Sequence, residues 1–117
     1  MAAPHRILIV EDEPLIAMML EDFIDMLDRE VAGVADNVAA ALDCIEEHEI
    51  HAAILDVNLR GGEQSWPVAE KLAARNIPFV LATGGAEDSI AEPFRGRPVL
   101  SKPFTMDGVE KALDALG

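Results

Sequence analysis

The feature that most constrains the fold of this chain is a regular alternation of short apolar runs with amphipathic stretches. The clearest runs, such as residues 7–10, contain only Ile, Leu and Val, which is typical of strands buried on both faces. Strands are expected at residues 7–10, 31–35, 52–56, 78–82 and 98–101. Strands that alternate with helices in this way predict an α/β domain in which helices cover both faces of a mostly parallel sheet.

The intervening stretches carry recognisable helix signals. Pro14 opens the first helical pattern, and proline suits a first turn because its missing N–H would have no partner there. Asn37 and Thr105 are placed to cap the second and the last helix, and a third helix is expected around residues 68–73. The pattern over residues 84–96 is poor, so we expect the fourth helix to be short or irregular.

Length, charge and cysteine content exclude several classes of protein. A chain of 117 residues has room for one compact domain. It carries 9 Lys and Arg against 22 Asp and Glu, a formal charge of −13, which should repel nucleic acids and anionic membranes. Cys44 is the single cysteine, so no internal disulfide can form. We see no signal peptide and no apolar run of the roughly 18 residues that a membrane helix needs, and we expect a soluble, intracellular domain.

Polar side chains follow the predicted strands at the points where the strands end. Glu11 and Asp12 come after the first strand, Asp56 ends the third, Thr83 follows the fourth and Lys102 follows the fifth. In doubly wound sheets, ligands bind beyond the carboxyl ends of the strands, at the point where the strand order reverses. We therefore expect these carboxylates, the hydroxyl and the ammonium group to share one small pocket.

The chemistry of such a pocket points to phosphoryl transfer. Carboxylates packed together repel one another and need a cation, and a few oxygen ligands with open positions suit Mg²⁺. A lysine and a hydroxyl opposite the metal complement a tetrahedral phosphoryl group. A carboxylate beside Mg²⁺ can itself be the nucleophile and form an acyl phosphate. The pattern therefore predicts an aspartate that accepts a phosphoryl group.

The same strand-end residues, in this order, resemble the receiver domain of bacterial response regulators over residues 6–116. The resemblance implies a flavodoxin-like fold: a doubly wound five-stranded parallel sheet with strand order 2-1-3-4-5. It also implies that residues 1–117 form a single receiver domain without an output domain. Such a protein is a single-domain response regulator in a two-component or phosphorelay system.

The resemblance assigns a role to each residue of the predicted metal site. Asp56 is the phosphoacceptor and also a Mg²⁺ ligand. Asp12 binds the metal directly and Glu11 binds it through a water molecule, while Asn58 supplies its backbone carbonyl. Asn58 also occupies a position that tunes the rate of dephosphorylation in the family.

Further roles implied by the resemblance concern the phosphoryl group and its surroundings. Thr83 hydrogen-bonds the phosphoryl oxygens and Lys102 pairs with them. Gly84 is small and leaves access to the aspartate, and Gly85 occupies the second position that tunes dephosphorylation. The bond between Lys102 and Pro103 is expected to be cis.

A narrower resemblance lies in the fourth strand and the residues after it. Residues 78–85 are similar to the FAT GUY motif of stand-alone alphaproteobacterial receivers, with departures at Leu81 and Gly85. That subgroup belongs to stress-signalling phosphorelays. Many receivers also carry a Tyr or Phe three residues before the lysine, where this chain has Val99, and the chain contains no Tyr. The usual coupling between the threonine and that aromatic residue therefore cannot operate here.

The resemblance also implies partners and a location. The phosphoryl donor would be a sensor histidine kinase or a histidine phosphotransferase, docking on the first helix near Leu15, Ala17 and Met18. An unidentified downstream protein would receive the signal by contact, with no role for nucleic acid or membrane. We expect a cytoplasmic monomer or weak dimer. It would be no enzyme toward other molecules, although it would assist its own phosphorylation and slow dephosphorylation.

The same residues admit other interpretations. The acidic residues 11–13 could simply favour the positive end of the first helix dipole. A Mg²⁺-dependent phosphatase of the haloacid dehalogenase type also forms an aspartyl phosphate, but it carries the nucleophile after the first strand and a second Asp two residues on, where this chain has Asn58. A binding module that uses the receiver fold without phosphorylation is the other alternative.

Overall fold

The computed structural model describes residues 5–57, 59, 63–83, 94, 97–101 and 104–116. Its strands are β1 (Arg6–Val10), β2 (Glu30–Ala35), β3 (Ala52–Asp56), β4 (Phe79–Thr83) and β5 (Val99–Ser101). Its helices, within those residues, are α1 (Pro14–Met26), α2 (Val38–Glu47), α3 (Trp66–Ala74) and α4 (Met106–Asp114). Every strand predicted from the sequence is present. The segment 84–96, where a short fourth helix was expected, lies outside the described residues except for Phe94.

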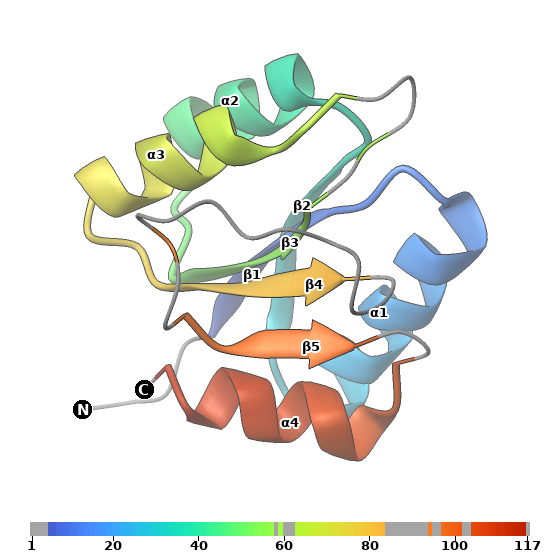
Figure 1. The fold of residues 1–117 in the computed structure, drawn as a ribbon. Coiled ribbons are helices and arrows are strands. Elements are labelled where there is room, and N and C mark those ends of the chain that lie inside the picture. Colours follow the sequence, from blue (N-terminus) through green and yellow to red (C-terminus); the bar gives the residue numbers. More distant parts are fainter. Residues whose placement is uncertain are drawn as a thin grey trace.

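The strands form one five-stranded sheet in the order β2-β1-β3-β4-β5. All four neighbouring pairs are parallel, which confirms the predicted topology (Figure 1). The order reverses between β1 and β3, because the chain passes from β1 outward to β2 and then returns to the other side of β1. The carboxyl ends of β1 and β3 therefore mark the switch point where ligands bind in doubly wound sheets.

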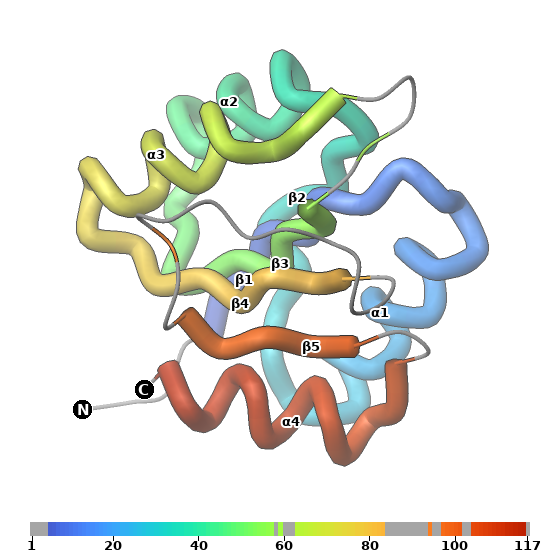
Figure 2. Tube along the Cα trace, in the orientation of Figure 1, coloured from blue at the N-terminus to red at the C-terminus, as the bar shows by residue number. Residues whose placement is uncertain are grey.

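Helices cover both faces of the sheet, so the core has two layers. Figure 2 shows α2 and α3 together on one side and α1 and α4 on the other. Side chains of β1, β3 and β4 alternate between these layers: Leu8, Leu55 and Leu81 pack with α2 and α3, whereas Ile9 and Ile54 pack with α1 and α4. All residues of β3 and β4 are buried, as expected for strands covered on both faces.

The predicted helix starts are also confirmed. Pro14 begins α1. The side chain of Asn37 accepts a hydrogen bond from the backbone N–H of Ala40 at 2.8 Å, and Thr105 Oγ1 accepts from the N–H of Gly108 at 3.0 Å. These caps satisfy donors that have no partner inside a helix. Within the described part of the chain, no helix is long and apolar enough to cross a membrane.

Candidate functional site

The register of β1 against β3 brings two acidic strand ends to the same level. Val10 pairs with Leu55 in the parallel ladder, so Glu11, directly after β1, and Asp56, the last residue of β3, lie side by side at the carboxyl edge of the sheet. Asp12 follows directly. This register explains why these carboxylates lie close together at the strand ends, as the sequence predicted.

Carboxylate oxygens of Glu11, Asp12 and Asp56 all lie within 4.8 Å of one another. We call these three residues the carboxylate cluster. Only 2% of the surface of Glu11 and 4% of that of Asp56 is exposed, and Asp12 is half-buried. Three negative charges this close, two of them shielded from water, favour binding of a cation. Hard oxygen donors that leave coordination positions open match the preference of Mg²⁺, so the donor set fits that metal.

Backbone hydrogen bonds hold the first acidic residue of the cluster in place. The N–H of Glu11 donates to the carbonyl of Ala35 at the end of β2, at 2.9 Å. Glu11 Oε2 accepts from the N–H of Glu13 at 3.1 Å, which orients its carboxylate just before α1 begins. A groove of about 390 Å³ opens beside the cluster. Its lining comes from α1, from β2 and from the residues that follow β1 and β2: Glu11, Asp12, Pro14, Ala17, Glu21, Val34 and Asp36.

Thr83 lies at the same edge of the sheet, on the strand next to Asp56. Asp56 pairs with Ala82, and the N–H of Val57 donates to the carbonyl of Ala82 at 3.0 Å. Thr83 is therefore the next residue beyond the level of Asp56, and it is buried. Its partner on β5 is Ser101, the residue that precedes Lys102.

Five of the predicted site residues cannot be placed from this structure. They lie outside the described residues and are Asn58, Gly84, Gly85, Lys102 and Pro103. Their roles, and the cis bond before Pro103, stay predictions from the sequence.

Of the three α1 residues expected at the docking surface, two are exposed and the third is buried. Leu15 and Met18 are exposed, at 77% and 55% of their surface. Ala17 is buried, at 5%, because it shares the sheet-facing side of α1 with Leu20 and Ile24, three and seven residues further along. A partner can contact Leu15 and Met18 but has little access to Ala17.

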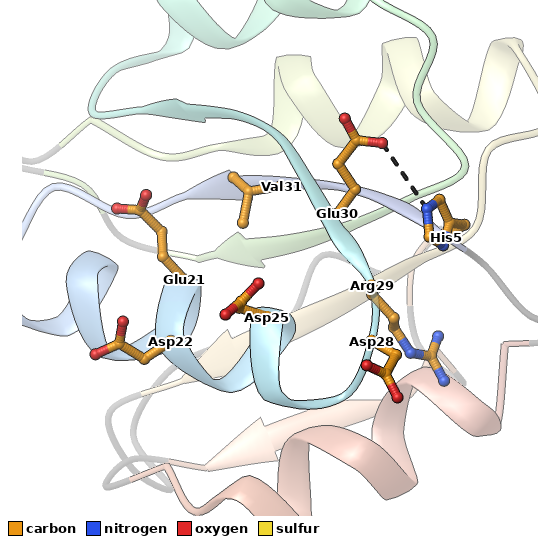
Figure 3. A pocket seen from close by; sticks show the side chains of 8 residues that line it. All are labelled: His5, Glu21, Asp22, Asp25, Asp28, Arg29, Glu30 and Val31. Carbon is orange, nitrogen blue, oxygen red and sulfur yellow. Dashed lines mark ion pairs between the residues drawn. The ribbon is translucent and has the colours of Figure 1, made fainter.

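A second acidic pocket, of about 630 Å³, lies away from the cluster between the second half of α1 and the start of β2 (Figure 3). It is lined by His5, Glu21, Asp22, Asp25, Asp28, Arg29, Glu30 and Val31. Among the described residues, its carboxylates do not converge as those of the carboxylate cluster do. Glu30 pairs with His5 and with Arg6.

Sequence reasoning missed Glu63, which joins the loop after Asp56 to the start of α2. Glu63 Oε1 accepts a hydrogen bond from the N–H of Val38 at 3.1 Å. The two residues are 25 positions apart, and no motif in the sequence links them.

The parallel sheet in the order β2-β1-β3-β4-β5 and the acidic and hydroxyl side chains at its carboxyl edge are those of a receiver domain. Comparison with protein families gives the same answer. The chain matches the response regulator receiver domain family over residues 7–114. It belongs to that family, whose members serve as receivers in two-component signalling.

Particular relatives are known at two levels of similarity. The solution structure of SdrG from Sphingomonas melonis Fr1 is 68% identical, with a TM-score of 0.89 over 99% of this chain and 98% of that chain. The solution structure of the BeF3-activated conformation of SdrG from Pseudomonas melonis Fr1 is also 68% identical to this chain. It has a TM-score of 0.84 over 99% of this chain and 98% of that chain. The transcriptional regulatory protein PdtaR of Mycobacterium tuberculosis is 28% identical over 97% of this chain, but this chain spans only 57% of its length.

Proposed function

We propose that this receiver accepts a phosphoryl group on Asp56 from a phosphohistidine and passes the signal on by protein contact. The observation that carries the proposal is the convergence of Glu11, Asp12 and Asp56 within 4.8 Å at the switch point of the sheet. SdrG, 68% identical, has a BeF3-activated conformation, and trifluoroberyllate mimics a phosphoryl group bound to a carboxylate.

The proposed step is an in-line displacement at phosphorus. One carboxylate oxygen of Asp56 forms the new P–O bond while the P–N bond to the donor imidazole breaks, and the imidazole leaves with the bonding electron pair. Water later attacks the acyl phosphate, which restores the carboxylate and releases inorganic phosphate. Positioning and charge neutralisation supply most of the acceleration in such transfers.

The chain's own groups have separate tasks in this step. Mg²⁺, when bound, would neutralise charge on the transferring group; Asp12 and Asp56 would hold it directly, Glu11 through a water molecule, and Asn58 through its backbone carbonyl. Thr83 would donate its hydroxyl to a phosphoryl oxygen and Lys102 would pair with another. The donor would be a histidine kinase or histidine phosphotransferase in the cytoplasm, docking on α1 through Leu15 and Met18, which are exposed there.

The direct test is the intact mass of the protein after incubation with acetyl phosphate, with and without Mg²⁺. We expect wild type to gain one phosphoryl group only with Mg²⁺, and Asp56→Asn to gain none. Asp36→Asn is the matched control, because Asp36 lines the adjoining groove and the substitution removes the same charge outside the cluster.

Two results would contradict the proposal. Equal labelling of Asp56→Asn and wild type would place the acceptor elsewhere. No labelling of wild type, either by acetyl phosphate or by a phosphorylated histidine phosphotransferase, would favour the alternative of a binding module that does not use phosphorylation.

A further inference from the structure

The loop between β3 and α3 starts directly after Asp56 and is closed by its own hydrogen bonds. The carbonyl of Val57 accepts from both the N–H and the hydroxyl of Ser65, at 3.2 and 3.3 Å. The N–H of Leu59 donates to the carbonyl of Glu63 at 2.7 Å. Val57 and Ser65 are fully buried and Leu59 is 5% exposed, so the base of the loop is anchored in the core.

Glu63, whose carbonyl accepts from Leu59, also contacts a different element through its side chain. Glu63 Oε1 accepts from the N–H of Val38, the first residue of α2, at 3.1 Å. Free N–H groups and the helix dipole make a helix start electropositive, so a carboxylate is a favourable partner there. Asn37 caps a different donor of the same helix, the N–H of Ala40. The exposed Glu63 side chain is thus held by α2, and its backbone holds Leu59.

We propose that Glu63 is a positioning residue for the Mg²⁺ and phosphoryl site, an inference that rests on the proposed function. Its two contacts connect α2 to Leu59, and Leu59 and Val57 flank residue 58. The backbone carbonyl of Asn58 is the expected metal ligand from this loop. A ligand supplied by backbone cannot adjust by rotating a side chain, so its position depends on how firmly the loop is held.

If the role of Glu63 were only to stabilise α2, the expected result would be different. If Glu63 only caps α2, then removing the other cap of that helix should have the same consequences. Asn37→Ala provides this control, because it removes the acceptor of the Ala40 N–H and leaves the contacts of Glu63 unchanged. Asn37 also donates to Asp36 at 2.7 Å. A second control, Glu46→Gln, therefore loosens α2 from α3 without changing residues 36–38.

The experiment is a titration with MgCl₂ at constant ionic strength, followed by the amide NMR signals of Asp56, Val57 and Leu59. We expect Glu63→Ala to bind Mg²⁺ about tenfold more weakly than wild type. Removing a group that orients a metal ligand commonly lowers metal affinity about 10- to 100-fold, so this is the low end of that range. Glu63→Gln, which keeps an oxygen acceptor, should fall between Glu63→Ala and wild type. Asn37→Ala and Glu46→Gln should match wild type, and the Leu59 amide should exchange faster with solvent in Glu63→Ala.

Each outcome decides between the two proposals. Unchanged Mg²⁺ affinity in Glu63→Ala, or an equal loss in Asn37→Ala, would overturn the role of Glu63 while leaving Asp56 as acceptor. Labelling by acetyl phosphate separates the failure of the Glu63 role from the failure of the proposed function. If wild type is labelled and Glu63→Ala binds Mg²⁺ as tightly as wild type, only the role of Glu63 is contradicted. A wild type that neither binds Mg²⁺ nor accepts a phosphoryl group would overturn the proposed function and the role of Glu63 with it.

Discussion

At the scale of single residues, Gly33 leaves no room for a side chain because it packs closely against Cys44. Gly33 lies in β2 where the register against β1 shifts, and it pairs with Leu8. A Cβ built on Gly33 would lie 2.3 Å from Cys44 Sγ, much closer than a van der Waals contact. Burial, aided by nearby Glu47, raises the pKa of the Cys44 thiol, consistent with a side chain that packs against the core.

Gly33→Ala should therefore destabilise the fold by about 1–3 kcal/mol, the usual cost of overpacking. Urea denaturation measures the change. The double variant Gly33→Ala/Cys44→Ala should recover much of the loss, because it removes the sulfur that the new methyl group meets. If the two substitutions were additive, the contact between these residues would not be the cause.

The site residues differ in how far the sequence could reveal them. Glu11, Asp12, Asp56 and Thr83 could be predicted because parallel strands in this order bring their carboxyl ends to one edge. The contact of Glu63 with Val38 could not, since it depends on how the loop after β3 meets α2. Ala17 was misjudged because exposure depends on which side of α1 faces the sheet, and the family resemblance alone did not fix that.

At the scale of elements, α2 and α3 are joined by an ion-pair network. Glu46 on α2 accepts hydrogen bonds from Lys71 and from Arg75, the latter at 2.7 Å, and these bonds lower the pKa of Glu46 below its ordinary value of 4.5. A carboxyl whose pKa is lower in the folded state stabilises the fold above its unfolded pKa. That contribution disappears as the pH falls through the folded pKa.

Glu46→Gln should accordingly lower stability slightly at pH 7, and the difference from wild type should shrink as the pH is taken below about 4.5. Thermal unfolding across pH measures this difference. Glu70→Gln, the same change at an exposed position of α3, is the control. A difference that is constant with pH would mean that the charge of Glu46 contributes nothing through Lys71 and Arg75.

Aromatic packing at the edge of α3 shows another limit of prediction at this scale. Phe94 stacks on Trp66 with ring centres 5.5 Å apart and meets the edge of Phe79 at 5.9 Å. The Arg97 guanidinium lies 4.4 Å from the Phe79 ring centre. Helical and strand periodicity indicated α3 and β4 correctly, but Phe94 lies in the segment 84–96, whose helical pattern is poor, and Arg97 directly follows that segment. Only the tertiary structure brings them to this cluster.

At the scale of the whole molecule, the sheet topology could be predicted from the sequence, whereas the distribution of charge over the fold becomes known only from the structure. Alternating strand and helix patterns allow few parallel arrangements, and the order 2-1-3-4-5 that the family resemblance implies is the observed one. The net charge of −13 is divided among distinct places in the fold. Five carboxylates line the pocket of Figure 3, and three others converge in the carboxylate cluster. These two groups should respond differently to salt and to divalent cations.

Monovalent salt should raise the melting temperature of every variant, because screening weakens repulsion across the acidic surface. Magnesium should add a specific effect. At a tenfold excess over its dissociation constant, a ligand that binds only the folded state stabilises it by about 1.4 kcal/mol, or about 5 °C in a domain of this size. We expect this increment in MgCl₂, over NaCl of equal ionic strength, for wild type and Asp36→Asn but not for Asp12→Asn. Equal increments in all three proteins would show that Mg²⁺ acts on the acidic surface as a whole and that the carboxylate cluster is not its binding site.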